Sequence, residues 1–236
     1  MEAFRSASVL IPTIDETAIE QVIARIALCC TPEEIGEFLI VYSPHSTKEY
    51  RQFLNEMPLR FPQHRVRSIP QEHQGLGGAL FTGFQRAEGS HIITIAADLE
   101  NDPDDVRKMI DLAKENPQCI ITASRRLTDD GFGDYPKLKK LLNNGFHLFL
   151  HWFLHIRQTD PTYLFQCTPR RVFDDHTFSE HHEAFVLELA LLPERRDIPL
   201  IEIPSVIRMR TSGKSHSSPR YYFHFLKYAI HTIWDR

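Results

Sequence analysis

Short runs of apolar and β-branched residues alternate with longer stretches of helical periodicity over the first 125 residues. The short runs are typical of buried strands, and the stretches between them repeat apolar residues every three or four positions, which predicts helices. Strands are predicted at residues 8–11, 37–42, 66–69, 92–96 and 119–123, and helices at 16–28, 50–56, 78–87 and 103–114. This alternation predicts an α/β fold with a mostly parallel central sheet flanked by helices.

The regular alternation stops after Arg126. Residues 129–134, Asp-Asp-Gly-Phe-Gly-Asp, have the composition of a loop. The remaining predictions are an aromatic helix at 137–156, an irregular segment, a helix at 184–192, a strand at 200–206 and a last helix from about Pro219. No repeat or low-complexity linker divides the sequence, so we interpret residues 1–236 as one continuous domain.

Composition narrows the class of protein. The sequence is 42% hydrophobic and 25% charged, as in ordinary globular proteins, and its net charge of −4 gives no general attraction to nucleic acid, which we exclude as a partner. No apolar run reaches the roughly 18 residues of a membrane-spanning helix, and the N-terminus lacks the pattern of a signal peptide. The four cysteines show no metal-type or disulfide-type spacing, which predicts free thiols and a cytoplasmic location.

Two carboxylates follow the predicted strand at 92–96. If the extended conformation continues past Ala96, Asp98 and Glu100 point the same way from the carboxyl end of that strand, where α/β sheets bind ligands. Two such carboxylates suit a divalent cation, which in turn would hold a diphosphate. The alternative is that Asp98 caps the turn before the helix that Pro103 begins. The strand and its carboxylates leave both interpretations open.

A glycine-rich turn and a basic pair are the other candidate binding elements. Gly75 and Gly77 let the backbone approach a ligand closely and lead into a helix N-terminus, which favours anions; they could equally form only a tight turn. Arg125 and Arg126 follow the strand at 119–123, so they lie at the same sheet edge and could pair with diphosphate oxygens. As surface arginines they would need no special explanation.

Four segments together carry a family resemblance. They are 8–16 (Ser-Val-Leu-Ile-Pro-Thr-Ile-Asp-Glu), 75–79 (Gly-Leu-Gly-Gly-Ala) with Gly83, 96–100 (Ala-Ala-Asp-Leu-Glu) with Pro103, and 210–215 (Arg-Thr-Ser-Gly-Lys-Ser). In order and spacing, over about residues 7–227, they resemble the family 2 glycosyltransferases of GT-A fold. The similarity is greatest to the dolichyl-phosphate mannose synthase-like and polyprenyl-phosphate sugar transferase branch.

The resemblance implies an inverting transfer of a sugar from a nucleotide-diphosphate sugar to a polyprenyl phosphate or a growing glycan, assisted by Mg²⁺ or Mn²⁺. It implies a nucleotide-sugar-binding half at 1–126 and an acceptor-side half at 127–236 that ends in an amphipathic helix. Asp98 and Glu100 are the implied metal ligands. The implied donor-binding residues are Pro12, Thr13, Glu16, Gly75, Gly77, Asp98, Arg125, Arg210 and Ser215. A non-catalytic relative that binds a nucleotide or a protein partner is the alternative.

Two departures from the family pattern motivate that alternative. Ala96 stands where the family usually has its first motif aspartate, which predicts a cation site that is weaker than usual. The second strand ends in Tyr42-Ser43-Pro44 where the family commonly has Asp-Asp-Gly, so the aspartate that usually contacts the nucleobase is missing. The sequence therefore does not identify the base.

Asp160, before Pro161, falls where polyprenyl-phosphate transferases carry an aspartate, and it is the candidate general base; a turn residue is the alternative. His147, His151 and His155 lie along one side of the predicted helix at 137–156. That side could bind zinc, pack on the core or on another copy of the chain, or contact a membrane. The amphipathic aromatic stretch at 221–234 could lie at an interface, as a homodimer contact or at a membrane surface, or it could be a packed terminal helix.

Overall fold

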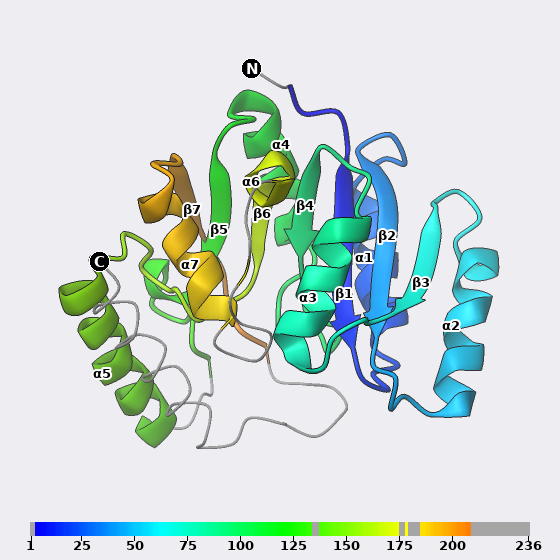
Figure 1. Ribbon diagram of the computed structural model, residues 1–236, viewed down its shortest axis with the longest axis horizontal. Helices are drawn as coiled ribbons and strands as arrows, with labels where there is room; N and C mark the ends of the chain where they lie inside the picture. The colour runs from blue at the N-terminus through cyan, green and yellow to red at the C-terminus, as the bar shows by residue number, and fades with distance from the viewer. Residues whose placement is uncertain (1–2, 134–136, 175–177, 179–184, 209–236) are drawn as a thin grey trace.

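The computed structural model describes residues 3–133, 137–174, 178 and 185–208, with the backbone alone for 137–142 (Figure 1). A seven-stranded sheet runs through it in the order β3-β2-β1-β4-β6-β5-β7. All pairings are parallel except those of β6, which is antiparallel to both β4 and β5. The strands are β1 (Ala7–Thr13), β2 (Ile35–Tyr42), β3 (Val66–Pro70), β4 (His91–Thr94), β5 (Ile120–Ser124), β6 (Gln166–Pro169) and β7 (Leu200–Pro204).

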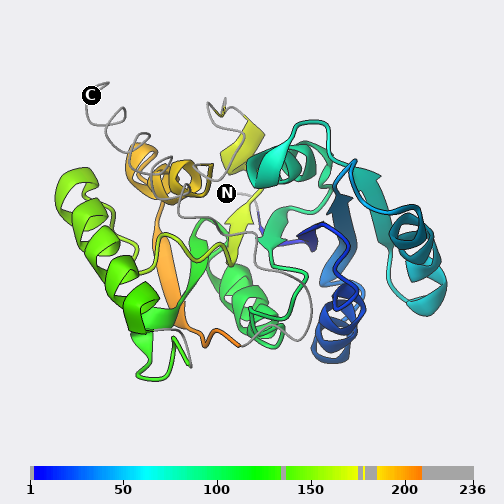
Figure 2. The ribbon, with the colours of Figure 1, turned by 90° about the horizontal axis from the view of Figure 1, so that it is seen from below.

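Helices cover both faces of the sheet, as Figure 2 shows from below. One hydrophobic core lies between the sheet and α1, α2 and α4, and a second lies between the sheet and α3 and α7. A third, smaller core joins α5 to α7. The helices are α1 (Ile19–Cys29), α2 (Lys48–Arg60), α3 (Gly75–Arg86), α4 (Asp105–Glu115), the 3-10 turn η1 (Arg125–Leu127), α5 (Lys137–Leu154), α6 (Arg171–Asp174) and α7 (Phe185–Arg195).

The side-chain alternation of β1 shows how the sequence builds the two cores. Val9 and Ile11 lie in the core with α1 and α4, and Leu10 lies in the core with α3 and α7. At Gly83 of α3 a Cβ would lie 2.3 Å from Leu10 Cδ1, so any side chain there would force the buried Leu10 to shift. The close approach fixes α3 against β1.

The predicted α/β architecture is confirmed, and most predicted elements are found with shifted ends. β6 is an addition, since the sequence showed only an irregular segment there. β4 ends at Thr94, so the expectation that the strand reaches residue 96 is wrong. The helix predicted from Pro219 lies outside the described residues. Within the described chain, no helix has both the length and the hydrophobicity needed to cross a bilayer.

Candidate active site at the carboxyl edge of the sheet

The parallel strands β1, β2, β4 and β5 end at one edge of the sheet, the lower edge in Figure 1. The ends of β1 and β2 are joined there, because the Ser43 N–H donates to the Thr13 carbonyl at 3.1 Å. The Thr13 hydroxyl is buried and lies 2.7 Å from the Tyr50 hydroxyl, which donates to the Glu16 carbonyl at 3.0 Å. Pro12 is still within β1, opposite Val41. The predicted donor-binding residues of this segment therefore form one braced turn.

The glycine-rich turn opens α3 at the same edge. Gly75 has a φ of 82°, a conformation that favours glycine, and the helix begins there instead of at residue 78. The side chain of the N-cap residue, Gln74, makes no capping hydrogen bond. A Cβ on Gly78 would lie 2.2 Å from the His73 carbonyl oxygen, so this glycine serves the fold of the turn itself. Gly75 and Gly77 precede that contact, in a first turn whose N–H groups suit an anion.

The chain after β4 is a turn and not an extended strand. Leu99 has a φ of 64°, and one Asp98 carboxylate oxygen accepts a hydrogen bond from the Glu100 N–H at 3.0 Å. The Ala96 N–H donates to the Asn101 side chain at 2.8 Å, which closes the loop. The strand-alternation argument for Asp98 and Glu100 is therefore wrong, and a tight turn presents both residues instead. We call residues 97–100 the carboxylate turn.

The alternative prediction, that Asp98 caps the turn before the helix, is confirmed for the turn itself. Asp98 caps its own turn through the Glu100 N–H, whereas α4 begins later, after Asp104, without a side-chain cap. Asp98 is also only 6% exposed, so its carboxylate is largely withdrawn from bulk water. A buried carboxylate at the end of a parallel strand is well suited to a hard cation.

Besides these two carboxylates, the described chain has other side chains of the types that bind metals. No group of three or more His, Cys, Asp or Glu residues is arranged to hold a metal ion within the described ranges. Two carboxylates still fit Mg²⁺ or Mn²⁺, because such ions commonly complete their shell with water and substrate phosphates. For the histidines of α5, the His147 and His151 ring centres lie 6.3 Å apart, and a His151 ring nitrogen lies 3.1 Å from the Ile156 carbonyl oxygen. This geometry does not support zinc binding.

Arg125 and Asp160 form a buried ion pair just after β5. Arg125 donates from Nε and Nη2 to the two carboxylate oxygens at 2.6 and 2.8 Å, and its backbone N–H donates to the same carboxylate at 3.2 Å. The guanidinium lies between the rings of Phe132 and Tyr163, at 4.8 and 4.6 Å from their centres. Arg125 is 5% exposed and Asp160 2%, so each neutralises the other inside the protein.

Arg126, the next residue, is held differently. Its two Nη atoms donate to the side-chain oxygens of Asn144 and Asn143 at 2.8 and 2.7 Å, and its Nε is buried without a hydrogen-bond partner. Among the described residues, no carboxylate forms an ion pair with it, and burial lowers the pKa of its guanidinium. The sequence prediction missed this cluster, because nothing in the local pattern connects Arg126 to the two asparagines of α5.

His147 lies one helical turn beyond Asn143. Burial lowers the pKa of His147, and the positive charge of Arg126 lowers it further. Its Nδ1 is buried without a hydrogen-bond partner. Arg126, Asn143, Asn144 and His147 thus form a polar cluster between the end of β5 and α5, which we call the Arg126 cluster. Its net charge is positive.

The last predicted element, with Arg210 and Ser215, lies outside the described residues. The chain that leads to it is described as far as Arg208, whose N–H donates to the Glu100 carbonyl at 3.0 Å. The segment before Arg210 therefore passes directly beside the carboxylate turn.

Residues 8–181 match the family described as Glycosyl transferase family 2. The chain belongs to this family. In the described structure, the elements that carried the resemblance, except the C-terminal one, meet at the carboxyl edge of one sheet.

Two relatives illustrate the branch. The chain is 27% identical over 132 residues to an undecaprenyl-phosphate 4-deoxy-4-formamido-L-arabinose transferase of Proteus mirabilis, covering 56% of this chain and 40% of that protein. It is 23% identical over 232 residues to a dolichol-phosphate mannosyltransferase of Pyrococcus furiosus, covering 97% of this chain and 64% of that protein. The chain thus spans less than two-thirds of either relative.

The fold has solved counterparts. A glucosyl-3-phosphoglycerate synthase from Mycobacterium tuberculosis, in complex with Mn²⁺, UDP and phosphoglyceric acid, superimposes with a TM-score of 0.71 at 16% identity. The superposition covers 98% of this chain and 78% of that chain. The same enzyme has been solved with Mg²⁺ and UDP, with a TM-score of 0.70. These similarities confirm the predicted GT-A fold.

Proposed function

We propose that this protein transfers a sugar from a nucleotide-diphosphate sugar to a phosphate-bearing acceptor, in a reaction assisted by a divalent cation. The observation that carries the proposal is the carboxylate turn at the end of β4, in a chain of family 2. It stands at one sheet edge with the braced turn after β1, the helix start at Gly75 and Arg126 after β5. The relatives named above act on undecaprenyl phosphate or dolichol phosphate, which supports a polyprenyl phosphate as acceptor.

On the donor side, Asp98 and Glu100 would hold Mg²⁺ or Mn²⁺, which supplies positive charge for the departing diphosphate. Thr13 and Glu16 border the nucleoside in this proposal, together with Pro12. The first turn of α3 at Gly75 and Gly77 offers N–H groups to the diphosphate. Arg210 and Ser215 contact the same diphosphate in this proposal, and we place them there from the family resemblance alone.

On the acceptor side, the Arg126 cluster is the binding element. A guanidinium held by two amides keeps its charge available to an incoming anion, and an arginine fits a phosphate through paired hydrogen bonds. A phosphate acceptor is ionised at neutral pH, so it needs little help from a base. Asp160 could act as a base only by releasing Arg125. We therefore propose that its main role in transfer is to fix Arg125.

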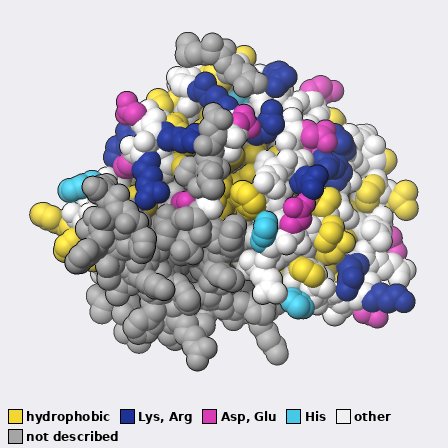
Figure 3. Space-filling view, in the orientation of Figure 1, with side chains coloured by type: hydrophobic (Ala, Val, Ile, Leu, Met, Phe, Trp, Pro, Cys, Tyr) yellow, Lys and Arg dark blue, Asp and Glu magenta, His cyan; other side chains and the backbone are white. Residues whose placement is uncertain are grey.

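The exposed apolar residues of α5 support contact with a lipid surface. Leu148, Trp152 and Phe153 are 58%, 70% and 57% exposed, and yellow side chains mark this rim of the molecule in Figure 3. Aromatic side chains favour the boundary between lipid and water. We propose peripheral membrane binding through this helix, at the cytoplasmic face where nucleotide sugars would be supplied. Homodimerisation through the same residues would appear instead as concentration-dependent mass in the absence of lipid.

The proposal is tested by a thermal-shift panel of nucleoside diphosphates and their sugars, with and without Mn²⁺, followed by a transfer assay with a short polyprenyl phosphate. One donor is expected to raise the melting temperature only with the cation, and to support transfer. Asp98→Asn should abolish both effects, while Asp111→Asn, an exposed α4 carboxylate paired with Arg107, should change neither. No response to any donor would favour the non-catalytic alternative.

A further inference from the structure

The segment that leaves β7 is held to the loop after β4 by Asp102. One carboxylate oxygen of Asp102 accepts a hydrogen bond from Arg208 at 2.5 Å, and the other accepts one from Arg25 of α1 at 2.6 Å. Arg25 also donates to Asp104 at 2.6 Å. Asp102 therefore joins three parts of the fold: α1, the loop that carries the carboxylate turn, and the chain after β7.

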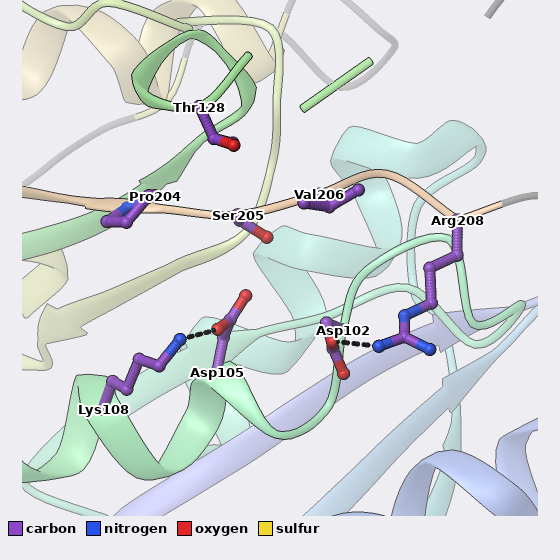
Figure 4. Close-up of a pocket in the computed structure, with 8 residues that line it drawn as sticks. All are labelled: Asp102, Asp105, Lys108, Thr128, Pro204, Ser205, Val206 and Arg208. Carbon is purple, nitrogen blue, oxygen red and sulfur yellow. Dashed lines mark hydrogen bonds and ion pairs between the residues drawn. The ribbon is translucent and has the colours of Figure 1, made fainter. Parts of the chain in front are cut away.

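A hollow of about 420 Å³ separates this segment from the first turn of α4 (Figure 4). Lys108 lies on the α4 side and is paired with Asp105 at 2.8 Å, while Val206 on the opposite side is 37% exposed. The hollow leaves the segment without an apolar contact to α4 there. Its position therefore depends on its hydrogen bonds and ion pairs. The lining residues are Asp102, Asp105, Lys108, Thr128, Pro204, Ser205, Val206 and Arg208.

Backbone hydrogen bonds of residues 205–208 hold this segment along the carboxyl edge of the sheet. The Ser205 N–H donates to the Ser124 carbonyl at 3.0 Å, and the Ile207 N–H donates to the Gly131 carbonyl at 2.9 Å. The Arg208 N–H then donates to the Glu100 carbonyl at 3.0 Å. Arg208 thus holds the loop twice, with its backbone at the carboxylate turn and with its side chain at Asp102.

The charges at Asp102 favour this arrangement. The guanidinium groups of Arg25 and Arg208 donate to opposite oxygens of the Asp102 carboxylate, and the Asp104 N–H donates to the same carboxylate at 3.3 Å. The Arg208 side chain is 53% exposed, so the pair adds little to global stability. Its effect is expected to be local, on the position of the loop.

We infer that Asp102 and Arg208 are positioning residues that hold the carboxylate turn in the geometry that binds a cation and a diphosphate. This inference rests on the proposed function of that turn. Neither residue is a ligand: Arg208 holds the Glu100 carbonyl, and Asp102 holds Arg208. Loss of the pair keeps both ligands, Asp98 and Glu100, in the chain, but it lets the carboxylate turn and the segment after β7 move apart. Cation binding is then weaker although no ligand has been removed.

The test measures Mn²⁺ binding in the presence of inorganic pyrophosphate, by electron paramagnetic resonance titration of the whole chain. Pyrophosphate is the probe because it needs no knowledge of the base or sugar. Asp102→Asn and Arg208→Gln should each weaken Mn²⁺ binding by about five- to tenfold, and the double variant should be no weaker than either single variant, because both remove the same interaction. Arg208→Lys should recover part of the affinity.

Asp104→Asn is the matched control. It removes a hydrogen bond from Arg25 as Asp102→Asn does, but within the described chain Asp104 forms no ion pair with Arg208, and its side chain is 61% exposed. Its Mn²⁺ affinity should stay within about twofold of the native value. If Asp98→Asn binds Mn²⁺ as the native chain does, the proposed function fails at its metal site. If Asp98→Asn loses binding while Asp102→Asn and Arg208→Gln match Asp104→Asn, only the positioning inference is wrong.

Discussion

Arg125 and Arg126 are neighbours in sequence, yet a carboxylate neutralises the charge of the first and not that of the second. Arg125 is buried, forms a two-point ion pair with Asp160 and lies between two aromatic rings. Arg126 is partly exposed and is bonded to two asparagine amides. Amides can orient a guanidinium without cancelling its charge, whereas a carboxylate does both. Arg125 therefore stabilises the fold, and Arg126 keeps a positive charge that can bind an anionic ligand.

The largest expected effect on stability comes from breaking the buried Arg125–Asp160 ion pair. Asp160→Ala leaves the Arg125 guanidinium buried without its counter-charge, so the free energy of unfolding should fall by about 3–5 kcal/mol. Urea denaturation measures the loss. Asp174→Ala is the control, because Asp174 faces Arg170 at 4.0 Å with half-exposed side chains, and such a surface pair should contribute less than about 1 kcal/mol. Similar losses in both variants would contradict the comparison.

Arg126→Gln tests whether the positive charge of Arg126 binds the acceptor phosphate. The KM for a short polyprenyl phosphate should rise by tenfold or more, equivalent to about 1.4 kcal/mol, because a charged hydrogen bond to the acceptor is lost. The KM for the donor and the urea midpoint should stay close to native, since no carboxylate is left unpaired. Arg51→Gln provides the control, because Arg51 is also bonded to uncharged oxygen, the Ser46 carbonyl, but on α2. An equal rise in acceptor KM in both variants would remove the special role of Arg126.

Glu202 allows the same comparison for a buried carboxylate, and the expected effect on stability is smaller. It accepts hydrogen bonds from the Thr159 N–H and hydroxyl, both at 2.9 Å, and burial raises the pKa of its carboxyl. A raised folded pKa means that stability is greatest below the unfolded value of about 4.5 and declines as pH rises through the folded value. Glu202→Gln avoids this decline and should stabilise the protein at pH 7 by less than about 1 kcal/mol.

The pH dependence of that effect is its check. Urea midpoints of the native protein and Glu202→Gln should converge below the unfolded pKa, because the native residue is then neutral too. A variant that is less stable than the native protein at pH 7 would show that Glu202 is ionised and favourable there, and the extension to carboxylates would be wrong.

The smallest expected effect is a titration shift at His147. The charge of Arg126 lowers the pKa of His147, after burial, which is the larger cause. Arg126→Gln should therefore raise the pKa of His147, as followed by the chemical shifts of its ring protons against pH. His64, whose pKa burial lowers without any contribution from Arg126, is the internal reference and should keep its native titration. An unchanged His147 titration would mean that the charge of Arg126 does not reach it.

The sequence predicted the sheet, its main helices and the edge where the candidate site lies, because apolar periodicity reports burial directly. It could not predict the positive φ of Leu99, which turns the chain after β4 and breaks the alternation assumed for Asp98 and Glu100. It also missed β6, four residues long and antiparallel within a parallel sheet. The Arg125–Asp160 pair joins residues 35 positions apart, a distance at which local patterns carry no signal.

The place of β5 in the sheet has a consequence for how the chain folds. β5 belongs by sequence to the first half, but its neighbours in the sheet, β6 and β7, both come from the second half. A fragment ending at residue 126 would therefore leave β5 without its native pairing and β4 as an open edge. The predicted boundary at residue 126 therefore does not separate two parts of the chain that could fold independently. Amide protons in β4 and β5 are expected to exchange together with those of β6, as one unit that opens only when the whole sheet does.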